Sequence, residues 1–298
     1  MKILLTGGNG QVGYELKRSL ALLGEVHAPG RAELDLADED ALRRVVRDLQ
    51  PQVIVNPAAY TAVDRAESDA AGAHAVNVRA PAVLAEEAQT LGSLLVHFST
   101  DYVFDGDKPG PYVETDATAP QGVYGSTKLA GEAAVQAACS RHLILRTSWV
   151  VGAHGGNFLK TMLRLAGERD SLSVVGDQTG APTSAALLAD LTALLVREAT
   201  RTPADFAHGL YHATAAGQTT WHAYACYVIE RARSAGRPGL IDPQVIRSIA
   251  SADYPTPAKR PANSVLDTRK LADTFGLRLP PWQEGVDRVL DQILRNPS

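Results

Sequence analysis

Tyr124 and Lys128 lie four residues apart, and this spacing suits proton chemistry. On a helix, residues at this distance lie on one face, one turn apart. A free tyrosine has a pKa of about 10, and a nearby ammonium stabilises the phenolate and lowers that pKa. The phenol then becomes a usable general acid or base. The alternative is an exposed pair on a solvated helix face. The motifs in the rest of the chain distinguish these two interpretations.

Hydroxyl and carboxyl groups come directly after a predicted strand, Leu94–Ser99, in the stretch that contains Thr100 and Asp101. In an open parallel sheet the ligand crevice lies beyond the carboxyl ends of the strands. Both residues are therefore candidates for the same site as Tyr124. The alternative is that they only cap the following turn.

The first residues have the order expected of a dinucleotide site. The aliphatic run Lys2–Thr6 predicts a buried strand, and Gly7-x-x-Gly10-x-x-Gly13 and an amphipathic helix follow it. The glycines allow a tight turn and close approach of the backbone to a pyrophosphate, and the helix N-terminus supplies unpaired N–H groups for that anion. A glycine-rich turn without a ligand is the alternative.

The segment after the second predicted strand, Val26–Ala28, bears on which nicotinamide nucleotide would bind. A fold that prefers NAD usually has an acid here for the ribose diol, whereas this chain offers Arg31, which could face a 2′-phosphate. A surface arginine is the equal alternative. Asp35 and Leu36 would line an adenine pocket, and the small residues of 57–61 would let a nicotinamide ribose pass close by.

The alternation of strands and helices through residue 150 predicts an α/β fold, a Rossmann-type doubly wound parallel sheet with a smaller, irregular α/β substrate domain. We expect the dinucleotide-binding domain at 1–152, completed by 184–218, and the substrate-binding domain at 153–183 and 219–298. The strands expected in the sheet are Lys2–Thr6, Val26–Ala28, Gln52–Asn56, Leu94–Ser99, His142–Thr147 and Gly209–Ala213. The helices expected include Asp38–Leu49, Asn77–Leu91, Phe158–Gly167, Ser184–Thr200, Trp221–Ala235, Leu271–Phe275 and Trp282–Leu294.

Composition argues against several classes of protein. The chain has 298 residues, 45% of them hydrophobic and 21% charged, as in an ordinary globular protein. Its net charge of −4 gives no electrostatic case for nucleic acid or an anionic membrane surface. Two cysteines outside any CxxC pair argue against a disulfide framework, and no apolar run is long enough to span a membrane. We expect a soluble, cytoplasmic protein.

Taken together, these motifs resemble the extended short-chain dehydrogenase/reductase superfamily and, within it, the dTDP-4-dehydrorhamnose reductase family. The resemblance runs nearly end to end. Its motifs are Gly-Gln-Val-Gly-x-Glu-Leu near residue 10, Ser-Thr-Asp-Tyr-Val-Phe, Val-Tyr-Gly-x-Thr-Lys-Leu-Ala-Gly-Glu, Arg-Thr-Ser-Trp-Val, Asp-Gln-x-Gly-Ala-Pro-Thr and Tyr-Pro-Thr-Pro-Ala-x-Arg-Pro.

The resemblance implies reduction of the C4 ketone of a dTDP-linked 4-keto-6-deoxy sugar to dTDP-L-rhamnose, with NADPH as cofactor and NADH as the alternative. Tyr124 would protonate the C4 oxygen, Lys128 would lower the pKa of Tyr124 and hold the nicotinamide ribose, and Thr100 would tune the acid. Asp101 and Trp149 would meet the sugar, with Thr100. The residues that would line the cofactor are Gly10, Gln11, Val12, Asp35, Leu36, Ala59, Tyr60 and Thr61.

Other activities remain open at this point. A nucleotide-sugar dehydratase would want an acid pair after Thr100, where this chain has Asp101 followed by Tyr102. An epimerase shares the tyrosine and the lysine and is harder to exclude. A non-catalytic regulatory subunit with this fold would not need either residue, and this chain has both.

One departure from the family concerns oligomers. Some members form dimers through a divalent cation held by three glutamates, and the corresponding positions here are Glu15, Ala186 and Gln283. Alanine has no ligand atom and an amide is neutral, whereas magnesium depends on carboxylate charge. Glu284 is adjacent to Gln283, but one helical residue turns a side chain by about 100°. We therefore expect no resident metal and no metal-bridged dimer.

Overall fold

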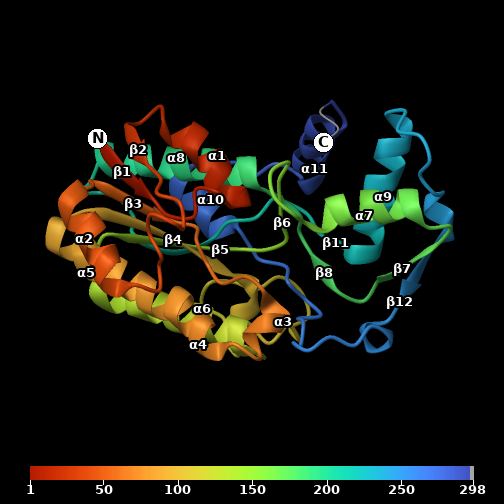
Figure 1. The fold of residues 1–298 in the computed structure, drawn as a ribbon, viewed down its shortest axis with the longest axis horizontal. Coiled ribbons are helices and arrows are strands. Elements are labelled where there is room, and N and C mark those ends of the chain that lie inside the picture. The colour runs from red at the N-terminus through yellow and green to blue at the C-terminus, as the bar shows by residue number, and fades with distance from the viewer. Residues whose placement is uncertain (296–298) are drawn as a thin grey trace.

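The computed structural model of the protein describes residues 1–295 and has two lobes side by side (Figure 1). The large lobe contains the N-terminus and a parallel sheet between two helical layers, and the small lobe is mostly helical. The elements of the large lobe are β1 (Lys2–Leu5), α1 (Gln11–Leu20), β2 (Glu25–His27), α2 (Glu39–Leu49), β3 (Val53–Asn56), α3 (Val63–Ala66), α4 (Ala70–His74), the π-helical turn η1 (Ala75–Arg79), α5 (Ala80–Leu91), β4 (Leu94–Thr100), η2 (Asp101–Val103), α6 (Val123–Ala138), β5 (His142–Thr147), α8 (Ala185–Arg201), β10 (Gly209–His212) and α10 (Arg269–Phe275). Those of the small lobe and the connections are β6 (Val150–Val151), α7 (Phe158–Glu168), β7 (Leu172–Val175), β8 (Thr179–Gly180), β9 (Thr183–Ser184), β11 (Thr219–Thr220), α9 (Trp221–Ser234), η3 (Pro243–Val245), β12 (Ile246–Ile249), η4 (Ser251–Asp253) and α11 (Trp282–Arg295).

The central sheet has six strands in the order β10-β5-β4-β3-β1-β2, and all neighbours are parallel. The strand order reverses between β1 and β3, because the chain first moves outward to β2 and then returns to β3. Such a reversal opens a crevice at the carboxyl ends of the strands, where ligands of doubly wound folds bind. The predicted Rossmann-type sheet is confirmed.

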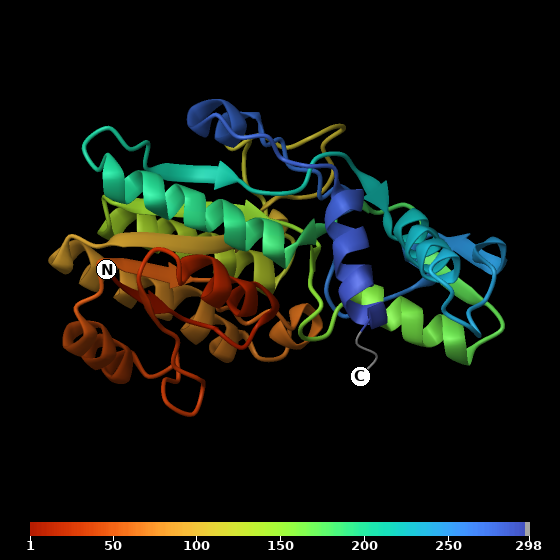
Figure 2. The ribbon, with the colours of Figure 1, turned by 90° about the horizontal axis from the view of Figure 1, so that it is seen from above.

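Alternate residues of the strands point to opposite faces of the sheet, and each face is covered by helices. Helices α2, α5 and α6 cover one face, and α1 and α8 cover the other, as the views from the front and from above show (Figures 1 and 2). The strands are apolar on both sides for this reason. Strand residues under α2, α5 and α6 are Leu4, Ile54, Leu95 and Ile144, and those under α1 and α8 include Ile3, Leu5, Val53, Val55, Val96 and Leu145.

The small lobe packs α7, α9 and α11 around an aromatic cluster that includes Tyr224 and Trp282. In the view from above, α11 lies between the two lobes (Figure 2). The small lobe also contains β12, which pairs in parallel with β7 and was not predicted. The four residues Ile246–Ile249 carry no clear alternation, and their partner strand is far away in sequence, so the local pattern could not reveal this pairing.

Two further elements differ from the predictions. The helix expected at Asn77–Leu91 begins earlier, because α4 and the π-helical turn η1 lead directly into α5. Helix α10 packs with its buried Leu271 on the core of the large lobe, together with Leu277 and Leu279. The division into two binding domains remains a proposal, and we place α10 with the dinucleotide-binding domain because of this packing. Residues 296–298 of the predicted substrate-binding domain lie outside the part of the chain that the structure describes.

Candidate active site

The glycine loop lies between β1 and α1, at the edge of the sheet where the strand order reverses. Gly7 has a φ of 60°, and a Cβ on Gly13 would lie 2.1 Å from the Gly7 carbonyl oxygen, so neither position accepts another residue without rearrangement. Gly10 precedes α1, and no side chain caps the first N–H groups of this helix. These N–H groups, in the first turn formed by Gln11, Val12 and Gly13, can therefore bind an anion.

Gln11 also connects the glycine loop with the small lobe. Its Oε1 accepts a hydrogen bond of 2.8 Å from Nδ2 of Asn157, which at the same time caps α7 through Lys160 N. His154, in the same loop as Asn157, stacks on Tyr14 of α1 at 4.3 Å between ring centroids. The predicted pyrophosphate loop is thus covered on one side by the segment 152–157.

The segment after β2 presents the groups proposed for the adenosine end of a nucleotide. Arg31 and Asp35 are exposed, and Leu36 is partly buried against the core under α2. Sequence reasoning passed over Glu33, whose Oε2 accepts a hydrogen bond of 2.7 Å from Gly30 N. Glu33 is two residues from Arg31 in the chain. A carboxylate and a guanidinium therefore both occur where such folds bind the 2′ position of the adenosine ribose.

The segment after β3 is held by a buried asparagine that the sequence analysis did not single out. Asn77, in the π-helical turn, accepts a hydrogen bond of 2.8 Å from Tyr60 N and donates one of 3.2 Å to Tyr60 O. Its Nδ2 also lies 3.1 Å from the hydroxyl of Thr127 on α6. Asn77 therefore couples Ala59, Tyr60 and Thr61 to the helix that carries Tyr124. An asparagine at the start of an otherwise apolar helix was the available signal.

Tyr124 lies in the first turn of α6 and lines the same cleft as Thr100. Burial raises the pKa of Tyr124 to about 12, the hydroxyl of Thr100 lowers that pKa through a hydrogen bond, and the negative charge of Asp101 raises it. The expected lowering by Lys128 is not among these influences. The ammonium of Lys128 turns toward β4, where Nζ lies 2.7 Å from the carbonyl oxygen of Phe98.

Lys128 is itself shifted by its surroundings. Its side chain is almost completely buried, and this burial lowers the pKa of Lys128 to about 8, while the charge of Glu132 on the same helix raises it. A buried ammonium at this pKa is partly neutral under mildly alkaline conditions. Tyr124 and Lys128 lie on one face of α6, as their spacing predicted, but the two groups titrate under separate influences.

A cleft of about 1200 Å³ separates the lobes and is lined from both sides. Its polar floor is formed by residues at the carboxyl ends of β4 and β5. Within residues 1–295, four buried oxygen atoms there have no hydrogen-bond partner: Ser99 Oγ, Asp101 Oδ2, Thr147 Oγ1 and Ser148 Oγ. Unpaired buried oxygens are costly, so this floor is suited to a ligand rich in hydroxyl groups.

Asp101 has a perturbed pKa on this floor. Burial raises the pKa of Asp101 to about 6, although neighbouring hydroxyls of Ser264 and Thr100 lower it. The carboxyl group can therefore change its charge near neutral pH, which is a property of functional sites.

Trp149 lies in the wall of the cleft with an unusual backbone. Its φ is 47°, which is rare for a bulky residue and indicates strain at a site that the surrounding structure enforces. Its ring stacks on Trp221 of α9 with 3.5 Å between centroids. The sequence analysis named Trp149 and missed Trp221, because their contact joins two segments from different parts of the chain.

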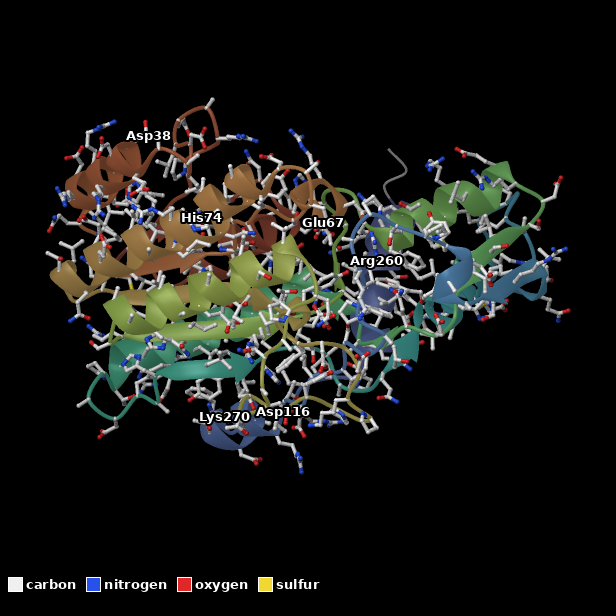
Figure 3. All side chains as sticks on the ribbon, turned by 90° about the horizontal axis from the view of Figure 1, so that it is seen from below. Asp38, Glu67, His74, Asp116, Arg260 and Lys270 are labelled. Carbon is white, nitrogen blue, oxygen red and sulfur yellow. The ribbon has the colours of Figure 1, made fainter. Side chains whose placement is uncertain are left out.

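Cationic side chains on the small-lobe side of the cleft were also missed. Arg260 forms a bidentate ion pair with Asp64, with its Nη2 2.8 Å from Oδ2. Figure 3 shows Arg260 at the junction of the two lobes. Lys259 and Arg169 line the same cleft. A phosphate group between the lobes would find donors here.

The described residues contain no cluster of three or more side chains arranged to bind a metal ion. Over the same part of the chain, none of the helices has the length and apolar character needed to cross a membrane.

Comparison with known proteins agrees with this geometry. The family model described as the RmlD substrate binding domain matches residues 1–295. A dTDP-4-dehydrorhamnose reductase of Escherichia coli (strain K12) is 49% identical over 298 residues, which is 98% of each chain. A solved structure of this reductase from Clostridium acetobutylicum is 35% identical with a TM-score of 0.88, covering 98% of this chain and 99% of that one.

A second solved structure, of a Bacillus anthracis dTDP-4-dehydrorhamnose reductase in complex with NADP, is 32% identical with a TM-score of 0.89 over 98% of this chain and 99% of that one. The matches extend through both lobes and include the glycine loop, α6 and the cleft. The chain therefore belongs to the dTDP-4-dehydrorhamnose reductase family, as its motifs predicted.

Proposed function

We propose that the protein reduces the C4 ketone of dTDP-4-dehydro-6-deoxy-L-mannose (dTDP-4-dehydrorhamnose) with NADPH and forms dTDP-L-rhamnose. The observation that carries this proposal is the meeting of Tyr124, Thr100 and Asp101 at one end of the sheet, in a cleft lined by both lobes. The full-length relatives carry the same activity in their names, and one of them is solved with NADP.

In this proposal the nicotinamide supplies the hydride, and the protein supplies the proton and the orientation. Tyr124 donates its proton to the C4 oxygen as negative charge develops there. The hydroxyl of Thr100 hydrogen-bonds to the phenol and lowers the pKa of Tyr124. Lys128 contributes positive charge beneath the site, and the contact to the nicotinamide ribose that the resemblance implies would require its ammonium to turn away from Phe98 O.

The nucleotide would extend from α6 to the glycine loop. Gly7, Gly10, Gln11, Val12 and Gly13 would surround the pyrophosphate, because α1 offers uncapped N–H groups there. Asp35 and Leu36 would line the adenine, and Ala59, Tyr60 and Thr61 the nicotinamide ribose. Glu33 beside Arg31 leaves NADH possible as well.

The sugar nucleotide would occupy the rest of the cleft. Its hydroxyl groups would bind to Thr100, Asp101 and the unpaired floor oxygens, with Trp149 against the sugar ring. Its diphosphate would lie near the cationic side chains of the opposite wall. The two free cysteines, Cys139 and Cys226, are in keeping with the reducing cytoplasm as the proposed location.

The direct experiment is to incubate the purified protein with NADPH and dTDP-4-dehydrorhamnose. Loss of nicotinamide absorbance together with formation of dTDP-L-rhamnose is the expected result. An epimerase would change the sugar without net NADPH consumption, and a regulatory subunit would change nothing. Either of those results would contradict the proposal.

We expect Asp101 to set the acidic limb of the pH profile. Its ionised carboxylate accepts stronger hydrogen bonds from the sugar than the protonated acid does, and its pKa of about 6 means that this advantage is lost as the pH falls through 6. The value of kcat/KM should therefore decline below about pH 6, since it reports ionisations of the free enzyme. Asp101→Asn should raise the KM for the sugar nucleotide about tenfold and remove this limb. An unchanged acidic limb in the variant would assign it to another group.

Arg31 provides a test of cofactor choice. If the guanidinium binds the 2′-phosphate, Arg31→Ala should raise the KM for NADPH about tenfold and leave that for NADH within about twofold, because NADH has no such phosphate. Steady-state rates with both nucleotides measure this difference. An equal loss for both would show that Arg31 does not contact the 2′-phosphate.

The absence of a metal-bridged dimer is a third expectation. Glu15 already has a cationic neighbour, with its Oε2 3.4 Å from Nε of Arg18, and Ala186 and Gln283 offer no carboxylate. EDTA should therefore change neither the mass in solution nor the activity. Light scattering with EDTA and with magnesium measures the mass, and a magnesium-dependent dimer would contradict the expectation.

A further inference from the structure

A buried chain of polar side chains leads from Lys128 into the centre of the sheet. His97 on β4 is completely buried, and its Nε2 lies 3.3 Å from Nζ of Lys128. The other ring nitrogen, Nδ1, lies 3.1 Å from Nδ2 of Asn56 on β3. The hydroxyl of Thr6 continues the chain with a contact of 2.5 Å to Oδ1 of Asn56. Thr6, which directly follows β1, Asn56 on β3 and His97 on β4 thus bring three polar side chains together across neighbouring strands.

Such a chain is unusual because two faces of this sheet are packed with aliphatic side chains. Each buried polar group here lowers stability unless it is fully hydrogen-bonded. A purely structural position at the sheet centre would be filled by a leucine or valine, as at Leu95 and Val96 beside it. These polar residues are connected to one another, and the chain that they form ends at Lys128.

The proton positions along this chain depend on the charge of Lys128. Burial, and then the charge of Lys128, hold the pKa of His97 well below its ordinary value, so the ring is neutral and has one donor and one acceptor nitrogen. A charged Lys128 has only donors and requires Nε2 as acceptor, which places the ring proton on Nδ1. Asn56 must then present its oxygen to the ring, and its amide donates to Thr6, whose hydroxyl can accept.

The opposite arrangement suits a neutral Lys128. When Asn56 donates from Nδ2 to Nδ1, the ring proton lies on Nε2 and points to Nζ. Only an uncharged amine can accept that proton in a hydrogen bond. The contacts among Thr6, Asn56 and His97 can therefore be made in two directions, one for each protonation state of Lys128.

We propose that His97 is a positioning residue for Lys128: its Nε2 holds the lysine nitrogen against β4, and its ring changes tautomer with the charge of that nitrogen. This inference rests on the function proposed above for Lys128. The nitrogen keeps two protein partners in both states, Phe98 O and His97. This contact fixes the position of α6 on β4, and with it the position of Tyr124 in the cleft.

Other charged or titratable side chains occur on α6 and on the elements packed against it, and most of the charged ones nearby form ion pairs of their own. The nearest charge on α6 itself is Glu132, which favours the ammonium. Arg146 of β5 pairs with Glu132, Asp64 of α3 pairs with Arg260, and Glu87 of α5 pairs with Arg47. The remaining titratable side chains on the packed elements are Asp101 and Tyr102 of η2, Arg79 of the π-helical turn, Glu86 of α5, Arg65 of α3, His74 of α4 and His142 of β5.

Two substitutions of similar size separate the contact at Nε2 from the contact at Nδ1. In His97→Gln the amide reaches the level of Nε2 and can still accept from Lys128, whereas in His97→Asn it ends at the level of Nδ1 and cannot. The loss of an acceptor disfavours the ammonium, so the alkaline limb of kcat should move down by about one pH unit in the Asn variant. In the Gln variant the alkaline limb should move by no more than about a third of the shift expected for the Asn variant.

The same variants should show a split between kinetic parameters. We expect kcat at the optimum to fall about tenfold in His97→Asn, with the KM of the sugar nucleotide changed less than about twofold, because the cleft floor is untouched. Equal alkaline limbs in the two variants, shifted or not, would overturn the proposal, since the contact at Nε2 would then not matter. The reverse order would overturn it as well.

Lys128→Met distinguishes this inference from the proposed function. If Lys128→Met retains the wild-type rate and alkaline limb, the proposed role of Lys128 is wrong and the limb belongs to another group. If it loses both, adding His97→Asn to Lys128→Met should cause no further shift of the pH profile. An additional shift in the double variant would show that His97 acts independently of Lys128.

A measurement on the unaltered protein keeps the test open if the variants do not fold. Ring-nitrogen NMR of histidine-labelled protein, with His97 assigned through its backbone resonances, reports the tautomer directly. We expect the proton on Nδ1 at about pH 6 and on Nε2 at about pH 10, with the change near the Lys128 pKa of about 8. A tautomer that stays the same over this range would overturn the proposal.

Discussion

Tyr124→Phe is expected to lower turnover by about 10²–10⁴-fold, the usual contribution of a positioned general acid. The variant keeps the ring and its edge-on contact with Tyr102, at 5.4 Å between centroids, and loses the hydroxyl that would protonate the C4 oxygen. Binding of NADPH should change little, because the glycine loop lies elsewhere. Rates of NADPH oxidation and fluorescence titration with NADPH measure the two properties.

Tyr102→Phe is the matched control for this substitution. It also removes one phenolic hydroxyl in the same cleft, and burial raises the pKa of Tyr102 above that of Tyr124. We expect it to keep turnover within about tenfold of the wild-type value, since no proton transfer is lost. A Tyr124→Phe protein with near wild-type turnover would remove Tyr124 from the mechanism, whatever the control shows.

Glu132→Gln is expected to reduce the free energy of unfolding by about 3–5 kcal/mol, because it leaves a buried guanidinium without its counter-charge. Glu132 on α6 and Arg146 on β5 form two hydrogen bonds of 2.8 and 2.6 Å, and their side chains are 2% and 4% exposed. This pair fastens the helix that carries Tyr124 and Lys128 to the sheet. Urea unfolding followed by tryptophan fluorescence measures the effect as a lower midpoint.

Two comparisons show whether burial is the cause. Glu168→Gln breaks the exposed pair of Glu168 and Arg164, and should cost no more than about 0.5 kcal/mol. The double variant Glu132→Leu/Arg146→Met removes both buried charges and should be more stable than Glu132→Gln alone. A loss below about 1 kcal/mol in Glu132→Gln would mean that water reaches the pair or that Arg146 finds another partner.

The local parts of the fold and the site could be predicted because near neighbours determine them. The glycine spacing from Gly7 to Gly13 requires a tight turn wherever it occurs between a strand and a helix. The spacing of Tyr124 and Lys128 places them on one face of any helix, and the structure has them on one face of α6. The Rossmann-type sheet followed from the alternation of apolar strands with amphipathic helices.

Only the tertiary structure decided how these parts act on one another. The direction of Lys128 toward Phe98 and His97, rather than toward the Tyr124 hydroxyl, depends on how deeply α6 packs on β4. The stack of Trp149 on Trp221 and the ion pair of Asp64 with Arg260 join segments that are distant in the sequence.

The pKa values of the site show the same division most clearly. Residue types alone give Asp101, Tyr124 and Lys128 their ordinary pKa values, whereas burial in the folded chain moves these values to about 6, 12 and 8. Burial is a property of the whole packed chain, because the atoms that exclude water from one side chain come from many elements. The sequence by itself therefore determined which groups are present and which helix or strand carries them, and the packing of the two lobes decided their charge and their partners.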